Sequence, residues 1–165
     1  MIPTLAKPRL DIEIRRATTG DLNGIMEIEE ASFTTPWPRE VMVNEITANP
    51  FSRVMVATHG KVVVSFTICW VIDRERYLQN IATAPAWRSR GVARMMMDHL
   101  LDEAQRDVPS EVMLEVRELN REARALYSSL GFAQTGRRKG YYSDTGEDAV
   151  IMSLNIDEEN PGSQE

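Results

Sequence analysis

The sequence changes abruptly between residues 76 and 105, from a strand pattern through a short loop to a helix pattern. The segment RYLQNIATA is typical of a strand, and the loop that follows it, PAWRSRG, contains a proline and two arginines. From residue 92 to residue 105, apolar side chains return at the spacing of one helix face. A strand and a helix joined in this way favour a fold in which helices pack on a sheet. The buried face of the helix is expected to contain Val92, Met95, Met96, Leu100 and Ala104.

The rest of the chain predicts further strands and helices in an order typical of an α+β fold. Strand patterns occur at 12–17, at 51–58 and 61–72 around a His-Gly turn, at 111–116, and as a closing pair within 137–156. Helix patterns occur at 18–33, where Thr19 or Asp21 could form the N-terminal cap, and at 40–47 and 120–132. Because strands come first and a strand–helix–strand–helix passage follows, we expect a mixed sheet.

The composition favours one globular domain. A chain of 165 residues with 42% hydrophobic residues can bury one core, and residues 1–156 are expected to form it. The longest nearly apolar stretch, 62–72, is far shorter than the roughly 20 residues that span a bilayer. The N-terminal segment lacks the continuous apolar run of a secretory signal. We therefore expect a cytoplasmic protein without membrane contact, and a disordered acidic tail at 157–165.

The charge distribution argues against nucleic-acid binding, and the positions of the two histidines argue against a metal site. The net charge of the chain is −6, and four acidic residues lie in the tail. Residues 1–156 therefore have a net charge of only about −2. The basic cluster at 137–139 is expected to be a solvated turn. His59 and His99 lie far apart without a metal-ligand pattern, so no metal is expected. The single cysteine, Cys69, lies in an apolar run and is expected to be a buried, inert thiol.

The loop before residue 92 has the chemistry of a phosphate site. The first N–H groups of a helix lack partners within the helix and lie at the positive end of its dipole. Gly91 would let a backbone approach closely, and Ala93 is small enough to leave room for a bulky anion. The loop lacks the lysine of a Walker loop and the three glycines of a dinucleotide fingerprint. An ordinary helix start with a glycine in the turn remains the alternative.

Two further segments contain candidate catalytic groups. Strand alternation places Glu115 on the face opposite Val112, Leu114 and Val116, although an ordinary solvent-facing glutamate has the same pattern. Asn120 and Tyr127 lie seven residues apart, so both lie on one side of a helix. A helix cap for Asn120 and a rim position for Tyr127 are the structural alternatives.

Taken together, these segments resemble a known family. NIATAPAWRSRGVARMMMDHLL, LEVRELNREARALYSSLGF and the closing YY…DAVIMSL resemble GNAT N-acetyltransferases, specifically the RimI-type ribosomal-protein-alanine N-acetyltransferases. EEASFTTPWPRE resembles the Phe/Pro/Trp segment of that group, so the resemblance covers about residues 12–156. It implies the acyl-CoA N-acyltransferase fold, with a mixed sheet of about seven strands flanked by about four helices.

The resemblance also implies an acetyl-CoA site and two catalytic residues. Glu115 would be the general base and Tyr127 the general acid, while Asn120 would contact the cofactor. Ala93 departs from the glycine that is common in the family. Pantetheine would pair with the strand backbone at Ile81, Ala82 and Thr83. The pyrophosphate would be bound by the loop that begins at Arg88, through the main chain of Ser89, Arg90, Gly91, Val92, Ala93 and Arg94.

The acceptor implied by the resemblance is the N-terminal alanine of a small-subunit ribosomal protein. We expect FTTPWP and GYYSDTG to form two walls of an acceptor groove, with Trp37 and Tyr142 as substrate-binding residues, although Trp37 could instead belong to the core. Two alternatives remain open: an acetyltransferase for other protein N-termini or a small amine, and a noncatalytic acetyl-CoA-binding module.

Overall fold

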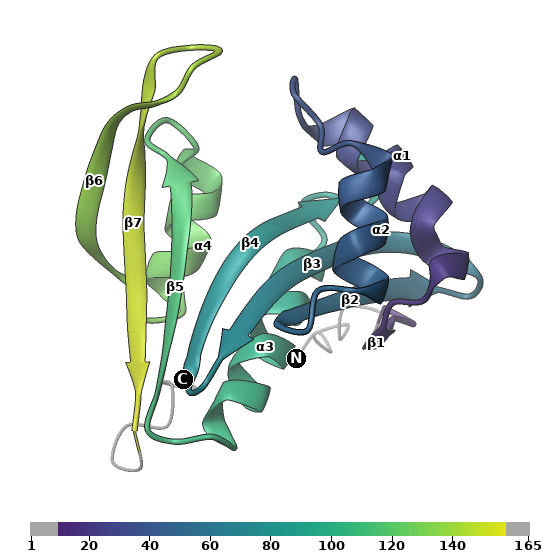
Figure 1. Ribbon diagram of the computed structural model, residues 1–165, viewed down its shortest axis with the longest axis horizontal. Helices are drawn as coiled ribbons and strands as arrows, with labels where there is room; N and C mark the ends of the chain where they lie inside the picture. The colour runs from purple at the N-terminus through teal and green to yellow at the C-terminus, as the bar shows by residue number, and fades with distance from the viewer. Residues whose placement is uncertain (1–9, 158–165) are drawn as a thin grey trace, which may run out of the picture.

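The computed structural model describes residues 10–157, which form a seven-stranded sheet with helices on both faces (Figure 1). The strand order is β1-β2-β3-β4-β5-β7-β6. This confirms the expected α+β architecture with a mixed sheet. The strands are β1 (Glu13–Arg16), β2 (Ser52–His59), β3 (Val62–Ile72), β4 (Glu75–Thr83), β5 (Ser110–Arg117), β6 (Ala133–Tyr142) and β7 (Glu147–Ile156), and the α-helices are α1 (Leu22–Ser32), α2 (Arg39–Thr47), α3 (Val92–Gln105) and α4 (Arg121–Ser129).

The pairing of β4 with β5 determines where the sheet opens. Among residues 10–157 it is the only parallel pair, and it runs only from Glu75 opposite Glu111 to Leu78 opposite Leu114. Beyond Leu78, β4 continues beside β3 alone and β5 beside β7 alone. The two strands therefore diverge, and their facing edges are no longer joined by a ladder (Figure 1).

Core side chains from alternate strand positions hold the helices on opposite faces of the sheet. Val54 and Val56 of β2 pack with α1 and α2, whereas Ala57 and Met55 pack with α3. A third cluster joins α3 and α4 to β5 and β7. The alternation follows from the two-residue period of a strand, which sends neighbouring side chains to opposite faces.

Two local predictions are wrong, and a third holds only in part, since Asp21 occupies the N-cap position of α1 without a capping hydrogen bond. Met97, rather than Met95, completes the buried face of α3. The basic cluster at 137–139 lies within β6, since the turn comes only after Tyr142. Asp21 precedes α1 but does not cap it with its side chain, because its carboxylate accepts hydrogen bonds from Arg15 and from the Thr18 backbone.

Other predictions from composition are confirmed or lie outside the described residues. Cys69 is buried, and burial raises the pKa of its thiol to about 12, so it is inert. The acidic tail lies outside the described residues except for Asp157. Within residues 10–157, none of the helices has both the length and the apolar character needed to cross a membrane.

Candidate functional site

The loop between β4 and α3 has the backbone conformation of a tight cradle. A short 3-10 turn (Pro85–Trp87) is followed by two residues with positive φ, Ser89 at 59° and Gly91 at 83°. Gly91 directly precedes the first residue of α3. A Cβ atom added to Gly91 would meet no atom within 4 Å, so the conformation, rather than lack of space, requires glycine. The result is an open helix N-terminus.

A cavity of about 490 Å³ lies against this loop and is called the larger cavity below. It takes one wall from β4, one from the start of α3 and one from α4. It brings together all of the predicted cofactor-binding residues except Arg90, whose guanidinium lies 4.1 Å over the Trp87 ring. The lining residues are Ile81, Ala82, Thr83, Trp87, Arg88, Ser89, Gly91, Val92, Ala93, Arg94, Asn120, Glu122, Ala123, Leu126 and Tyr127.

Arginine side chains brace the larger cavity. Arg88 donates from Nε to the Thr83 carbonyl at 3.0 Å and from Nη2 to Ser32 Oγ at 3.0 Å. Arg94 donates to Ser129 Oγ at 2.5 Å, which links α3 to α4. An open helix N-terminus, nearby guanidinium groups and the unpaired edge of β4 fit an elongated group that carries phosphates.

A β-bulge lies in β4 where it leaves β5. Ile68 of β3 faces Asn80 and Cys69 faces Leu78, so Gln79 is the extra residue between them. Bulges change the direction of a strand and are common beside functional sites. Gln79 lies in the wall of a second cavity.

This second cavity of about 320 Å³ is called the smaller cavity below. It meets the larger cavity at Ile81, Asn120, Ala123 and Tyr127, which line both. It is lined by the predicted residues Glu115, Trp37 and Tyr142, whereas Arg90 lines neither cavity. The other lining residues are Glu29, Phe33, Thr35, Leu78, Gln79, Asn80, Val116 and Arg117.

Tyr127 lies where the two cavities join. It is only 4% exposed, so the alternative of a rim tyrosine is wrong. Burial raises the pKa of its hydroxyl to about 12, and Tyr142 adds to the rise. Two turns earlier, Asn120 Oδ1 accepts a hydrogen bond from the Ala123 backbone at 3.2 Å and caps α4. Asn120 is thus both a helix cap and a cavity residue.

Glu115 borders the smaller cavity and is partly exposed. Its side chain is 31% exposed, and Arg138 Nε of β6 lies 3.1 Å from its Oε1. The sequence analysis missed this ion pair because it assigned 137–139 to a turn. The two residues face each other across β7, where Glu115 pairs with Ile151 and Arg138 with Ala149.

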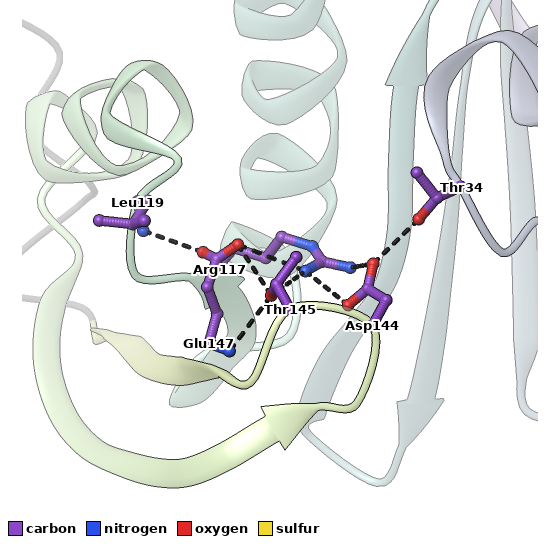
Figure 2. A network of polar contacts seen from close by, with 6 residues as sticks. All are labelled: Thr34, Arg117, Leu119, Asp144, Thr145 and Glu147. Atoms are coloured by element: carbon purple, nitrogen blue, oxygen red, sulfur yellow. Dashed lines mark hydrogen bonds and ion pairs between the residues drawn. The ribbon is translucent and has the colours of Figure 1, made fainter.

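The two segments expected to form acceptor walls both border the smaller cavity and contact each other. Thr34 of FTTPWP donates a hydrogen bond of 2.9 Å to Asp144 of GYYSDTG (Figure 2). Asp144 also accepts two hydrogen bonds, of 3.0 and 2.9 Å, from the guanidinium of Arg117. The guanidinium lies 4.1 Å over the Tyr142 ring. One arginine thus positions Tyr142 and, through Asp144, the opposite wall.

Glu147 completes this polar network at the start of β7. Its carboxylate contacts Arg117 Nη1 at 3.5 Å and accepts hydrogen bonds from Thr145 Oγ1 and from the Leu119 backbone (Figure 2). The same guanidinium holds the pKa of Asp144 below its usual range. The network therefore ties β5 to the β6–β7 turn.

Trp37 lies at the border between the core and the smaller cavity, so its position is compatible with both of the roles that the sequence left open. It packs against the core cluster of α1, α2 and β3, and it also lines the smaller cavity. Its backbone N–H donates a 3.0 Å hydrogen bond to Glu29 Oε1.

Glu29 is a cavity residue that the sequence analysis missed. It is 1% exposed, and its Oε2 accepts a 2.7 Å hydrogen bond from Asn80 Nδ2. Its spacing of three and four residues from Met26 and Ile25 places it on the buried face of α1. That spacing was the available signal for a buried carboxylate.

Two features of the fold indicate the class of protein. Strands β4 and β5 diverge, and the loop after β4 leads into the open N-terminus of α3. Residues 22–132 match the family model described as "Acetyltransferase (GNAT) family", so the chain belongs to the GNAT acetyltransferase family. Within described residues, no cluster of three or more His, Cys, Asp or Glu side chains is placed to hold a metal.

Two relatives indicate the subgroup of the family that this chain resembles. The [ribosomal protein bS18]-alanine N-acetyltransferase of Escherichia coli K12 is 34% identical over 140 residues, which cover 84% of this chain and 93% of the relative. The N-alpha-acetyltransferase RimI of Mycobacterium tuberculosis is 33% identical over 147 residues, covering 86% and 90%.

Solved structures agree with the sequence comparisons. The crystal structure of the ribosomal-protein-S18-alanine N-acetyltransferase from Escherichia coli has a TM-score of 0.82 at 32% identity, covering 88% of this chain and 94% of that one. Ard1 from Thermoplasma volcanium has a TM-score of 0.79 at 28% identity, covering 88% and 97%. The GNAT fold and the RimI-type resemblance are thereby confirmed.

Proposed function

We propose that the protein is an acetyl-CoA-dependent N-terminal acetyltransferase that modifies the N-terminal alanine of a small-subunit ribosomal protein. The observation that carries this proposal is the meeting of two cavities at a buried tyrosine, with the Glu115 carboxylate in the wall of the smaller cavity. Tyr127 lines both cavities, whereas Glu115 lines only the smaller one. The relatives named as ribosomal-protein-alanine N-acetyltransferases support the choice of acceptor.

Acetyl-CoA fits the larger cavity. Bound there, it would supply an acetyl group activated as a thioester. The main chain of residues 89–94 would bind the pyrophosphate, assisted by the dipole of α3. The edge of β4 at 81–83, which lacks a neighbouring strand on the side of β5, would pair with the pantetheine arm. Asn120 would contact the cofactor from the start of α4.

Glu115 and Tyr127 divide the proton transfers between them. An α-amino group has a pKa near 7.7 to 8.0, so at neutral pH one proton must leave before the nitrogen can attack. Glu115 takes that proton, directly or through a water, and the amine forms the new C–N bond at the thioester carbon. The C–S bond breaks, and Tyr127 gives its phenolic proton to the departing thiolate. The second proton of the attacking nitrogen leaves as the amide forms, and it restores the Tyr127 hydroxyl. Trp37 and Tyr142 border the space for the acceptor chain.

An acetylation assay with defined peptides tests the proposal. The protein, acetyl-CoA and a peptide with N-terminal alanine should release CoA, and mass spectrometry should place the acetyl group on the α-nitrogen. A peptide array would then rank other first residues and small amines, which are the alternative acceptors. Tight binding of acetyl-CoA without CoA release on any acceptor would favour the noncatalytic module instead. A ribosomal acceptor also implies a cytoplasmic site of action.

Replacing Gly91 by valine is expected to weaken acetyl-CoA binding about tenfold or more. A β-branched residue is strained at a φ of 83°, so the loop should leave the conformation that presents its N–H groups. Titration calorimetry measures the effect. Gly60→Val is the matched control, because Gly60 also has a positive φ, of 58°, in a turn that borders neither cavity. Unchanged affinity in the Gly91 variant would refute the phosphate-binding role.

A further inference from the structure

Glu29 is a buried charged side chain for which the proposed reaction has no role. It lies on α1, is 1% exposed and borders the smaller cavity. One oxygen accepts a hydrogen bond from the Trp37 backbone and the other from the Asn80 amide. Both donors are neutral, and Glu29 takes part in none of the ion pairs found among residues 10–157.

A buried carboxylate without a cation is energetically unfavourable. Burial of an ionised group is costly unless an opposite charge is close, and two neutral hydrogen bonds offset only part of that cost. Burial accordingly raises the pKa of Glu29, while the hydrogen bonds from Trp37 and Asn80 oppose the rise. Each carboxylate oxygen can accept more than one hydrogen bond, so capacity for a further donor remains.

We propose that Glu29 is the binding site for the α-ammonium group of the acceptor N-terminus. This inference rests on the proposed function, which places a protein N-terminus in the smaller cavity. An α-ammonium group is a cation with three N–H donors, and it would supply the positive charge that Glu29 lacks. The fixed hydrogen bonds from Trp37 and Asn80 hold the carboxylate in place before the acceptor arrives, which reduces the entropy cost of binding.

The two carboxylates of the smaller cavity differ in a way that assigns them different tasks. Glu115 is partly exposed and already has Arg138 at 3.1 Å, so its charge is compensated. Glu29 is buried and has only neutral partners. Glu29 therefore binds the acceptor as a cation, and Glu115 receives its proton.

Two peptides that differ only at the amino group test this assignment. The first begins with alanine, and the second carries a propionyl group in place of the alanine, which removes the amine and keeps the shape. Calorimetry with CoA present measures binding without turnover. The wild-type protein should bind the amine peptide about tenfold to a hundredfold more tightly. Glu29→Gln should abolish this preference, and Glu30→Gln, on the exposed side of α1, should retain it.

The alternative outcomes are distinct. If Glu29→Gln weakens both peptides equally, the carboxylate only supports the Trp37 segment and the proposal fails. If that variant does not fold, as judged by its melting curve, Glu29→Asp should still prefer the amine peptide, and the loss of that preference would overturn the proposal. Equal binding of both peptides by wild-type protein overturns it directly. Absence of CoA release from wild-type protein with the alanine peptide would instead refute the proposed function.

Discussion

Glu115→Gln is expected to lower kcat by about 10²- to 10⁴-fold at neutral pH, because it removes the group that takes the amine proton. Glutamine keeps the size of the side chain, and Val112, Leu114 and Val116 on the opposite face of β5 remain packed. Raising the pH should partly restore the rate, since more of the acceptor amine is then already unprotonated. Steady-state rates with an alanine peptide from pH 6 to pH 10 would record both effects.

Two control variants separate the base from its surroundings. Glu111→Gln changes a carboxylate on the same strand that lines neither cavity, and it should leave kcat unchanged. Arg138→Gln breaks the 3.1 Å ion pair but keeps the Glu115 carboxylate, so it should retain most of the activity. Wild-type kcat across the pH range in Glu115→Gln would reduce Glu115 to an ordinary strand glutamate.

Tyr127→Phe should lower kcat by a similar factor of about 10² to 10⁴ at every pH, with little change in acetyl-CoA affinity. The hydroxyl has a pKa of about 12 and therefore stays protonated across the whole assay range. High pH should not restore the rate, because the missing group is an acid. Phenylalanine preserves the packing of the ring, whose centroid lies 6.0 Å from that of Phe132.

The matched control for the acid is Tyr141→Phe. Tyr141 is 50% exposed and lines neither cavity, so the loss of its hydroxyl should have no effect on kcat. Recovery of the Tyr127→Phe rate at high pH would contradict the role of Tyr127 as the acid.

The order of strands and helices could be predicted because most elements have a clear period. The bounds of α3 match the predicted range of 92–105. Met95 was predicted to be buried in place of Met97, because three consecutive methionines give no contrast in hydrophobicity. The predicted range of β6 was too short because most residues of this edge strand are exposed. A strand with few buried positions lacks the alternation of apolar and polar residues that would indicate it.

Residue spacing groups candidate residues only where neighbours in sequence are neighbours in space, and the roles expected of Glu115, Asn120 and Tyr127 came from the family resemblance. The loop at 88–94 and the pair Asn120 and Tyr127 belong to single elements, so local spacing sufficed. The Glu115–Arg138 pair, the Thr34–Asp144 hydrogen bond and the contact of Glu29 with Asn80 each join distant segments. Such contacts depend on strand order, which local residue spacing does not reveal.

The divergence of β4 from β5 also leaves two cavities to which the β6–β7 hairpin contributes differently. The residues lining the larger cavity all lie between 81 and 127, well inside the family match at 22–132. Tyr142 and its support from Asp144 lie in the β6–β7 hairpin beyond that match. If the proposed function is right, replacing Tyr142 should change the binding of the acceptor and leave the larger cavity intact, because no residue of the hairpin lines that cavity.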